Sequence, residues 1–228
     1  MAEQQAMQTE RTQMGFTLVE IAIVLVIIGL LVGGILKGQE MITQARIKNV
    51  INDFNGITAA YFSYWDRYRA IPGDDDRAPG RWALGAVGTS ATAGNGNLEG
   101  TWNAATAAVE PETRLFWWNL RSAGFISGPT APPAQAAAQA TNAFGSMIGA
   151  ATGTGAATLS LSGLIICSSG IPDKVAIAVD TQMDDQNAGT GSLRAIEGGS
   201  TTALAALAVP PLNYVETGST QYLLCRGV

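Results

Sequence analysis

The chain has 228 residues, of which 47% are hydrophobic and 14% are charged, and its 13 Lys and Arg against 18 Asp and Glu leave a formal charge of −5. This excess of acidic residues argues against sequence-independent binding of nucleic acid, which depends on basic side chains that neutralise phosphates. The absence of His excludes His general bases and Ser-His-Asp or Cys-His nucleophile pairs, and two Cys alone are too few ligands for a zinc site. The sequence also contains no P-loop and no G-x-S-x-G elbow, so we expect a protein that is not an enzyme.

A long apolar segment lies near the N-terminus. Phe16–Leu36 has 21 residues and a single charge, Glu20. As a helix it would be about 32 Å long, enough to cross a hydrocarbon core of about 30 Å. The segment is too long for the apolar core of a secretory signal peptide, and no small-residue cleavage pattern follows it. An ionisable side chain inside such a segment indicates a function, because its burial in lipid is costly.

The stretch Gly15–Glu20, with the sequence GFTLVE, precedes and opens this segment. It resembles the class III signal of type IV pilins and pseudopilins. The resemblance implies that a prepilin peptidase removes a leader of residues 1–15 by cutting between Gly15 and Phe16, and then methylates the amine of Phe16. It also implies that Glu20 is the residue that directs assembly.

The function that the resemblance implies is structural. The chain would be made as a bacterial inner-membrane precursor and would then form a homo-oligomeric helical filament at the cell surface. Extension would require an assembly ATPase and an inner-membrane platform supplied by other proteins. The alternatives are a periplasmic pseudopilin of a type II secretion system and a minor pilin that acts as an adhesin or tip module.

Small residues in the apolar segment are spaced for helix packing. Gly29 and Gly33 form one G-x-x-x-G pair, and Gly34 and Gly38 form a second. Such pairs allow apolar helices to approach one another closely. The alternative is incidental glycine in a glycine-rich chain.

The helix is predicted to continue beyond the apolar segment. Apolar residues recur at spacings of mostly three and four up to Tyr68, which predicts an amphipathic helix over residues 37–70 that continues the segment at 16–36. Pro72 then prevents further helix.

The remaining residues, 71–228, predict an α+β domain with long loops at 73–110 and 129–158. We expect a small antiparallel sheet packed on the N-terminal helix. The predicted elements are a helix opening at Pro111, a strand at Thr158–Cys167, a helix at Ile171–Met183, a strand at Gln221–Cys225, and weaker strands at Ser192–Ile196 and Tyr214–Val215.

Cys167 and Cys225 end the two best strand candidates. Two Cys in an exported domain usually pair under oxidising conditions, and a C-terminal disulfide is frequent in pilins. The resemblance therefore implies a Cys167–Cys225 disulfide, with two free buried thiols as the alternative.

Acidic residues gather near the predicted helix at Ile171–Met183, among them Asp180, Asp184 and Asp185. Carboxylate oxygens are the ligands that Ca²⁺ prefers, and some pseudopilins hold calcium in a C-terminal loop. Calcium is therefore the one cofactor that the sequence suggests. The alternative is a solvated helix end and turn, and the same alternative applies to Asp74–Asp76.

Overall fold

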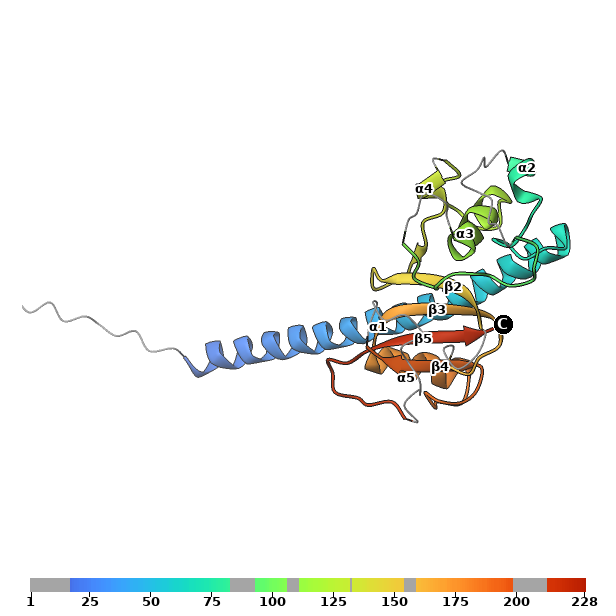
Figure 1. The fold of residues 1–228 in the computed structure, drawn as a ribbon. Helices are drawn as coiled ribbons and strands as arrows, with labels where there is room; N and C mark the ends of the chain where they lie inside the picture. The colour runs from blue at the N-terminus through green and yellow to red at the C-terminus, as the bar shows by residue number, and fades with distance from the viewer. Residues whose placement is uncertain (1–16, 83–92, 106–110, 132, 154–158, 199–212) are drawn as a thin grey trace, which may run out of the picture. The chain divides into compact units, whose positions relative to one another are not determined.

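The structure is a computed structural model that describes residues 17–82, 93–105, 111–131, 133–153, 159–198 and 213–228 (Figure 1). The chain divides into two units, Met1–Ile42 and Thr43–Val228. In chain order the elements are α1 (Leu18–Tyr68), α2 (Ala78–Trp82), α3 (Glu112–Ser122), α4 (Pro133–Ala136), β1 (Ala140–Thr141), β2 (Met147–Gly153), β3 (Gly163–Pro172), α5 (Asp173–Met183), β4 (Leu193–Glu197) and β5 (Gln221–Gly227).

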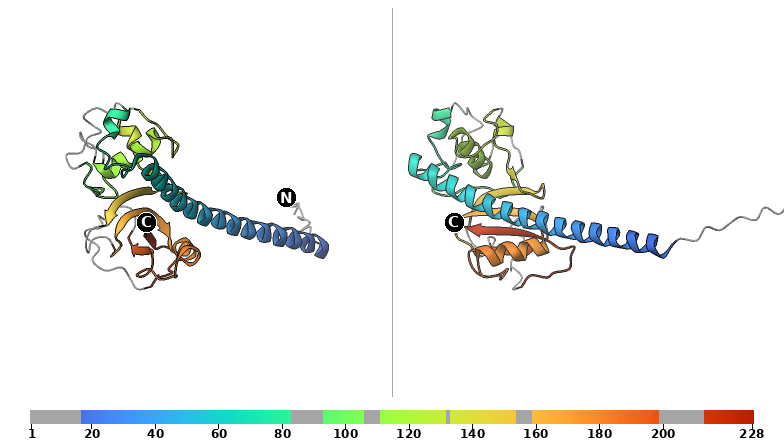
Figure 2. Two further views of the ribbon diagram at one scale, coloured as in Figure 1. Left: turned by 90° about the vertical axis from the view of Figure 1, so that its right-hand side faces the viewer. Right: turned by 180° about the vertical axis from the view of Figure 1, so that it is seen from behind.

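The second unit is built on an antiparallel sheet with the strand order β1-β2-β3-β5-β4. Alternate residues of a strand face opposite sides of the sheet. Ile166 and Leu224 therefore join a core with α1, α3 and α5, whereas Cys167 and Cys225 join a smaller core on the other face. α3 lies toward the β2 side of the sheet and α5 toward the β4 side (Figures 1 and 2). The long helix and small antiparallel sheet confirm the predicted α+β class.

The part of α1 in this unit contributes one apolar face to the larger core. Its buried residues recur at intervals of three and four, as the sequence pattern predicted: Ile47, Val50, Phe54, Ile57, Ala60 and Tyr64. The helix ends at Tyr68, shortly before Pro72. Gly73 then has a φ of 94°, and a Cβ there would lie 2.4 Å from the carbonyl oxygen of Glu112. Only glycine fits this close approach between the chain and the start of α3.

The predicted helix at Pro111 is α3, with Pro111 at its N-cap position. Gly124 follows the helix with a φ of 79°, and its N–H donates to the carbonyl of Arg121. This is the left-handed helix end that glycine favours. The apolar residues Leu115, Phe116, Trp117 and Leu120 of this helix are buried, whereas Phe125, which follows it, is only partly buried.

The expected loop over 129–158 was wrong for part of its length. α4, β1 and β2 all lie within this range, and β2 pairs with β3 from Ile148 to Gly153. The small residues of β2 permit close packing, because a Cβ at Gly149 would lie 1.9 Å from the carbonyl oxygen of Trp102. The loop over 73–110 likewise contains the short helix α2, while residues 83–92 and 106–110 lie outside the described residues.

Two predicted strands also differ from the structure. The strand expected at Thr158–Cys167 begins later, at Gly163, and continues to Pro172. Its polar extension at Ser168 and Ser169 is buried, and Asn142 Nδ2 donates to both, to Ser168 Oγ at 2.9 Å and to the Ser169 carbonyl at 2.7 Å. This hydrogen bonding comes from a distant residue, so the local pattern did not indicate it. Tyr214–Val215 is not a strand. The weak strand predicted at Ser192–Ile196 is β4.

Candidate functional site

The helix α1 begins with a capping box at the N-terminal signal. Thr17 donates to Glu20 Oε2 from both its backbone nitrogen and its hydroxyl, each at 2.8 Å, and Glu20 donates its own N–H to Thr17 Oγ1 at 3.2 Å. These reciprocal bonds satisfy N–H groups that a helix start leaves without partners. The sequence signal for this motif is a Thr followed three residues later by a Glu, the spacing of Thr17 and Glu20. Gly15 and Phe16, the predicted cleavage and methylation residues, lie outside the described residues.

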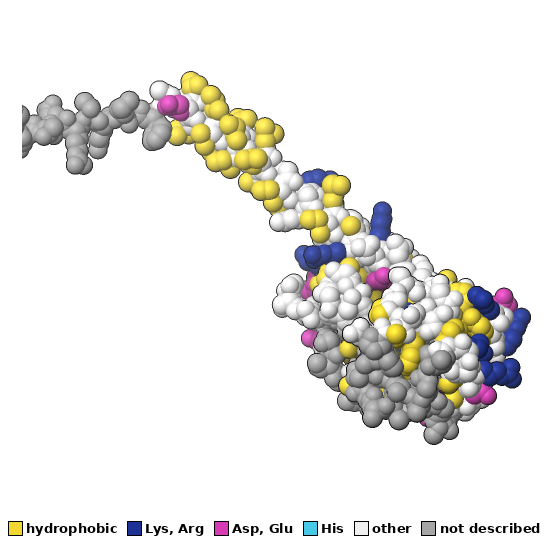
Figure 3. Space-filling model, turned by 90° about the horizontal axis from the view of Figure 1, so that it is seen from above, with side chains coloured by type: hydrophobic (Ala, Val, Ile, Leu, Met, Phe, Trp, Pro, Cys, Tyr) yellow, Lys and Arg dark blue, Asp and Glu magenta, His cyan; other side chains and the backbone are white. Residues whose placement is uncertain are grey.

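The apolar part of α1 presents hydrophobic side chains on all sides. Every residue from Leu18 to Leu36 is exposed, and Figure 3 shows hydrophobic side chains covering the visible face of this part of the helix. Leu18 is 88% exposed and Leu30 is 73% exposed. By length and composition, α1 is apolar enough to cross a membrane. A surface of this kind is stable only against lipid or other apolar helices.

The four glycines predicted for helix packing lie on this exposed part of α1 or at its end. Apart from the adjoining backbone of the helix itself, no heavy atom of the described residues lies within 4 Å of the place that a Cβ would occupy at Gly29, Gly33, Gly34 or Gly38. The space beside each glycine is therefore open to a second helix. Packing of another chain there stays a prediction.

Cys167 and Cys225 form a disulfide in the structure. They face each other directly in the register of β3 and β5, and both are buried in the smaller core beside Trp102 and Leu223. The bond joins the neighbouring strands β3 and β5 on the face of the sheet that does not carry α1. This is the pair that the sequence suggested, and its position indicates a structural role.

The acidic cluster at the end of α5 brings together the three residues predicted to bind calcium. One carboxylate oxygen from each of Asp180, Asp184 and Asp185 lies within 4.8 Å of the others. Each carboxylate also accepts a hydrogen bond within the protein: Asp180 from the Tyr214 hydroxyl at 2.6 Å, Asp184 from the Leu193 N–H at 2.8 Å, and Asp185 from the Asn187 N–H at 3.0 Å. The bonds to Asp184 and Asp185 hold the connection between α5 and β4, and the bond from Tyr214 ties α5 to the segment that precedes β5.

The cluster concentrates negative charge at a partly buried position. Burial raises the pKa of Asp180, and the carboxylates of Asp184 and Asp185 raise it further, against hydrogen bonds from Tyr214 and Gln186 that lower it. A divalent cation would relieve this repulsion. The ligand type and spacing are suitable for Ca²⁺, and calcium binding stays a prediction.

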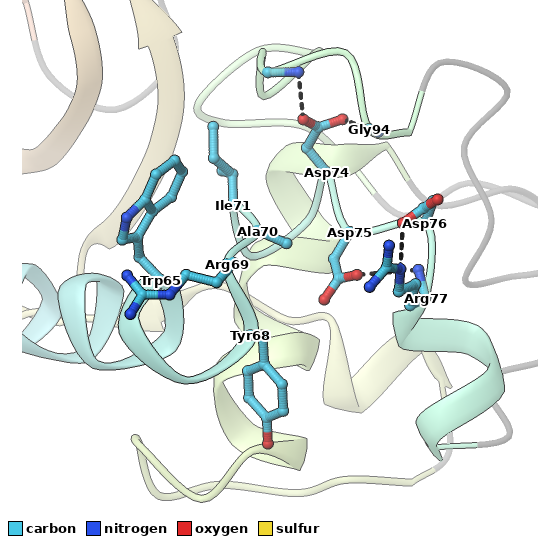
Figure 4. A pocket seen from close by; sticks show the side chains of 11 residues that line it. Trp65, Tyr68, Arg69, Ala70, Ile71, Asp74, Asp75, Asp76, Arg77 and Gly94 are labelled. Carbon is cyan, nitrogen blue, oxygen red and sulfur yellow. Dashed lines mark hydrogen bonds and ion pairs between the residues drawn. The ribbon is translucent and has the colours of Figure 1, made fainter.

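The second acidic group, Asp74–Asp76, lines a pocket of about 480 Å³ at the C-terminal end of α1 (Figure 4). Asp74 accepts backbone N–H groups from Gly94, Asn95 and Gly96 at 2.5, 3.1 and 2.7 Å. Asp75 accepts the hydroxyl of Tyr64 at 2.6 Å and also pairs with Arg81. Two of the three carboxylates therefore hold the loop in place, which favours a structural role.

Comparison with known proteins finds one similarity, and it falls on the N-terminal segment. Residues 11–36 match the family model described as the prokaryotic N-terminal methylation motif. No curated protein and no solved structure matches the chain. The matched range contains Gly15, Phe16, Glu20 and the exposed apolar part of α1. The chain therefore carries the class III signal of type IV pilins and pseudopilins.

Proposed function

We propose that this protein is a structural subunit of a type IV pilus-like filament, assembled through the apolar part of α1 after a prepilin peptidase has removed residues 1–15. The methylation motif implies a structural protein and a membrane-anchored precursor. The observation that carries the proposal is the exposure of the whole segment Leu18–Leu36 beside that motif. Lipid would cover this segment in the precursor, and the same segments of neighbouring subunits would cover it in the filament.

Glu20 would give this assembly its register. Cleavage would leave a protonated amine at Phe16, and both this amine and the Glu20 carboxylate lose water in an apolar filament core. A charge buried alone is costly, whereas a well-placed pair offsets much of that cost. The contact would select one axial position, because apolar helices without it could slide past one another.

The geometry around Glu20 is suitable for such a contact. The backbone N–H and the hydroxyl of Thr17 donate to Oε2 of the carboxylate, and no group among the described residues donates to Oε1. Glu20 can therefore keep its capping box and still accept a hydrogen bond from the amine of a neighbouring subunit.

The proposal is tested by following processing and filament yield together. Glu20→Val should leave precursor cleavage and membrane insertion intact but abolish filaments in the sheared surface fraction. Gly15→Val should leave the leader uncut in intact-mass measurements. Glu40→Gln is the matched control, because Glu40 is an exposed carboxylate on the same helix whose contact is with Lys37. Normal filament yield from Glu20→Val would overturn the proposed role of the carboxylate.

The same fractions distinguish the proposed filament from the alternatives. A major subunit should be the most abundant protein in sheared filaments. A secretion pseudopilin or a tip subunit should be scarce there, and its loss should instead impair export or adhesion. Mature protein that retains residues 1–15 would contradict all three assignments.

A further inference from the structure

A second pocket, of about 400 Å³, lies in the domain where α1, α3 and β1 come together. Its lining includes the buried apolar side chains of Ile57 and Ile148. Asp53 from α1 and Arg121 from α3 also line it. Binding pockets for small molecules typically combine an apolar lining with a few polar groups that fix orientation.

Asp53 is a half-buried carboxylate without a partner among the described residues. It has neither an ion pair nor a hydrogen bond there, and burial raises its pKa. A carboxylate that loses water without gaining a partner costs free energy of folding. The Asp53 carboxylate lines a pocket, where a positively charged group of a ligand would supply the partner that the described residues do not.

The positively charged guanidinium of Arg121, in the same pocket, also has a hydrogen-bond donor without an acceptor among the described residues. Arg121 donates from Nη1 to the carbonyl of Ala136 at 2.5 Å, and its buried Nε has no acceptor among the residues that the structure describes. The pKa of this guanidinium is lowered by burial and by the charge of Arg114. Trp117, which also lines the pocket, is 1% exposed and its Nε1 lacks an acceptor in the part of the chain that the structure describes. Asp53 and Arg121 form no ion pair with each other, although they line the same pocket.

We propose that this pocket binds a small zwitterion, with its ammonium group on Asp53 and its carboxylate on Arg121. The two protein charges require opposite charges at two places in one ligand. A simple amine would leave Arg121 unmatched, and a simple carboxylate would leave Asp53 unmatched. The apolar side chains of Ile57 and Ile148 in the lining are suitable for the methylene groups between the two ends of an amino-acid-like molecule. The proposal is independent of filament assembly.

The test is calorimetric titration of the full chain in a non-ionic detergent, because a zwitterionic detergent would compete. The probes are glycine, 4-aminobutyrate and 6-aminohexanoate, which differ in charge separation, with butylamine and butyrate as single-charge controls. At least one zwitterion should bind at least tenfold more tightly than either single-charge probe, because each matched charge contributes separately. Asp53→Asn should weaken that zwitterion at least tenfold.

Two further variants make the result specific to the pocket. Gly56 lines the pocket, and apart from the adjoining helix backbone no heavy atom of the described residues lies within 4 Å of the place of a Cβ there. Gly56→Leu should therefore fill the opening and abolish binding without disturbing the helix. Asp66→Asn is the control, since Asp66 is an exposed carboxylate on α1 whose ion pair is with Arg69. The proposal is overturned if no zwitterion binds saturably at concentrations up to tens of millimolar, or if Asp53→Asn and Gly56→Leu bind as the wild type does.

Discussion

Asp75 connects three segments of the domain, and its removal is a strong test of the structure. Its carboxylate is buried and accepts the Tyr64 hydroxyl from α1 at 2.6 Å, the Arg77 N–H at 3.0 Å and the Arg81 guanidinium from α2. Burial holds the pKa of Tyr64 well above its usual value, against the opposing charge of Arg81. The phenol therefore stays protonated and donates to the carboxylate throughout the physiological pH range.

The cost of Asp75→Ala can be worked from these contacts. Removal of one partner from a buried charge pair typically costs about 3–5 kcal/mol, because the other charge is left without compensation. Arg81 retains 27% side-chain exposure, so water can partly solvate it, and the low end of that range applies. Tyr64 loses its acceptor in the core, which adds to the same penalty. We therefore expect a loss of about 3 kcal/mol in the free energy of unfolding.

The assay is urea unfolding of the full chain in a non-ionic detergent, followed by tryptophan fluorescence. Asp76→Ala is the matched control, because Asp76 is exposed and its nitrogen-to-oxygen distance to Arg77 is 4.0 Å. An exposed pair of this kind should contribute less than about 1 kcal/mol. If Asp75→Ala unfolds at the same urea concentration as Asp76→Ala, the described network does not stabilise the domain.

The disulfide, the Asp173 carboxylate and the acidic cluster each have a measurable consequence. Replacing both Cys167 and Cys225 by Ser should lower the free energy of unfolding by about 4 kcal/mol on the chain-entropy model, since the bond spans a sequence separation of 58; unfolding curves that coincide with those of the wild type would refute this. Burial raises the pKa of Asp173, but three backbone N–H groups outweigh it and hold the pKa below the ordinary 3.8. Its stabilisation is therefore complete above about pH 4 and is lost as the pH falls through the folded-state pKa, so Asp173→Asn should destabilise the protein at neutral pH and much less near pH 3. A destabilisation by Asp173→Asn that is equal at both pH values would contradict the assigned hydrogen bonds. Millimolar Ca²⁺ should raise the melting temperature of the wild type above that of an EGTA control, and Asp185→Asn should reduce this increase. Identical melting curves with Ca²⁺ and with EGTA would refute calcium binding at the acidic cluster.

The sequence alone was informative where structure depends on neighbouring residues. The helix α1 was predicted almost to its last residue, because its apolar run and its three-and-four spacing are local patterns ended by Pro72. The start of α3 at Pro111 and its end near Gly124 were predictable for the same reason. The class III signal is also a short contiguous motif, and the comparison with known proteins matched that segment.

The sequence was uninformative where distant residues determine local structure. β2 is composed mainly of small residues, and its place in the sheet depends on β3 and on the backbone of Trp102 packed against Gly149. The extension of β3 through Ser168 depends on Asn142, which lies 26 residues away in the chain. The pocket that contains Asp53 and Arg121 likewise joins two helices, and neither residue belongs to a recognisable motif.

The burial pattern along α1 divides the helix into two stretches with different roles. Between Ile47 and Tyr64, one face is buried in the domain core and the other is polar, so this stretch stabilises the fold. Between Leu18 and Leu36, no residue is buried and almost none is polar, so this stretch contributes nothing to the core. A chain selected only for the stability of its domain would have no reason to keep that exposed apolar surface, which makes it insoluble outside lipid or an assembly. The exposed stretch is therefore best explained by contacts outside the chain, and its overlap with the methylation motif supports the proposal that the membrane covers it first and other subunits cover it afterwards.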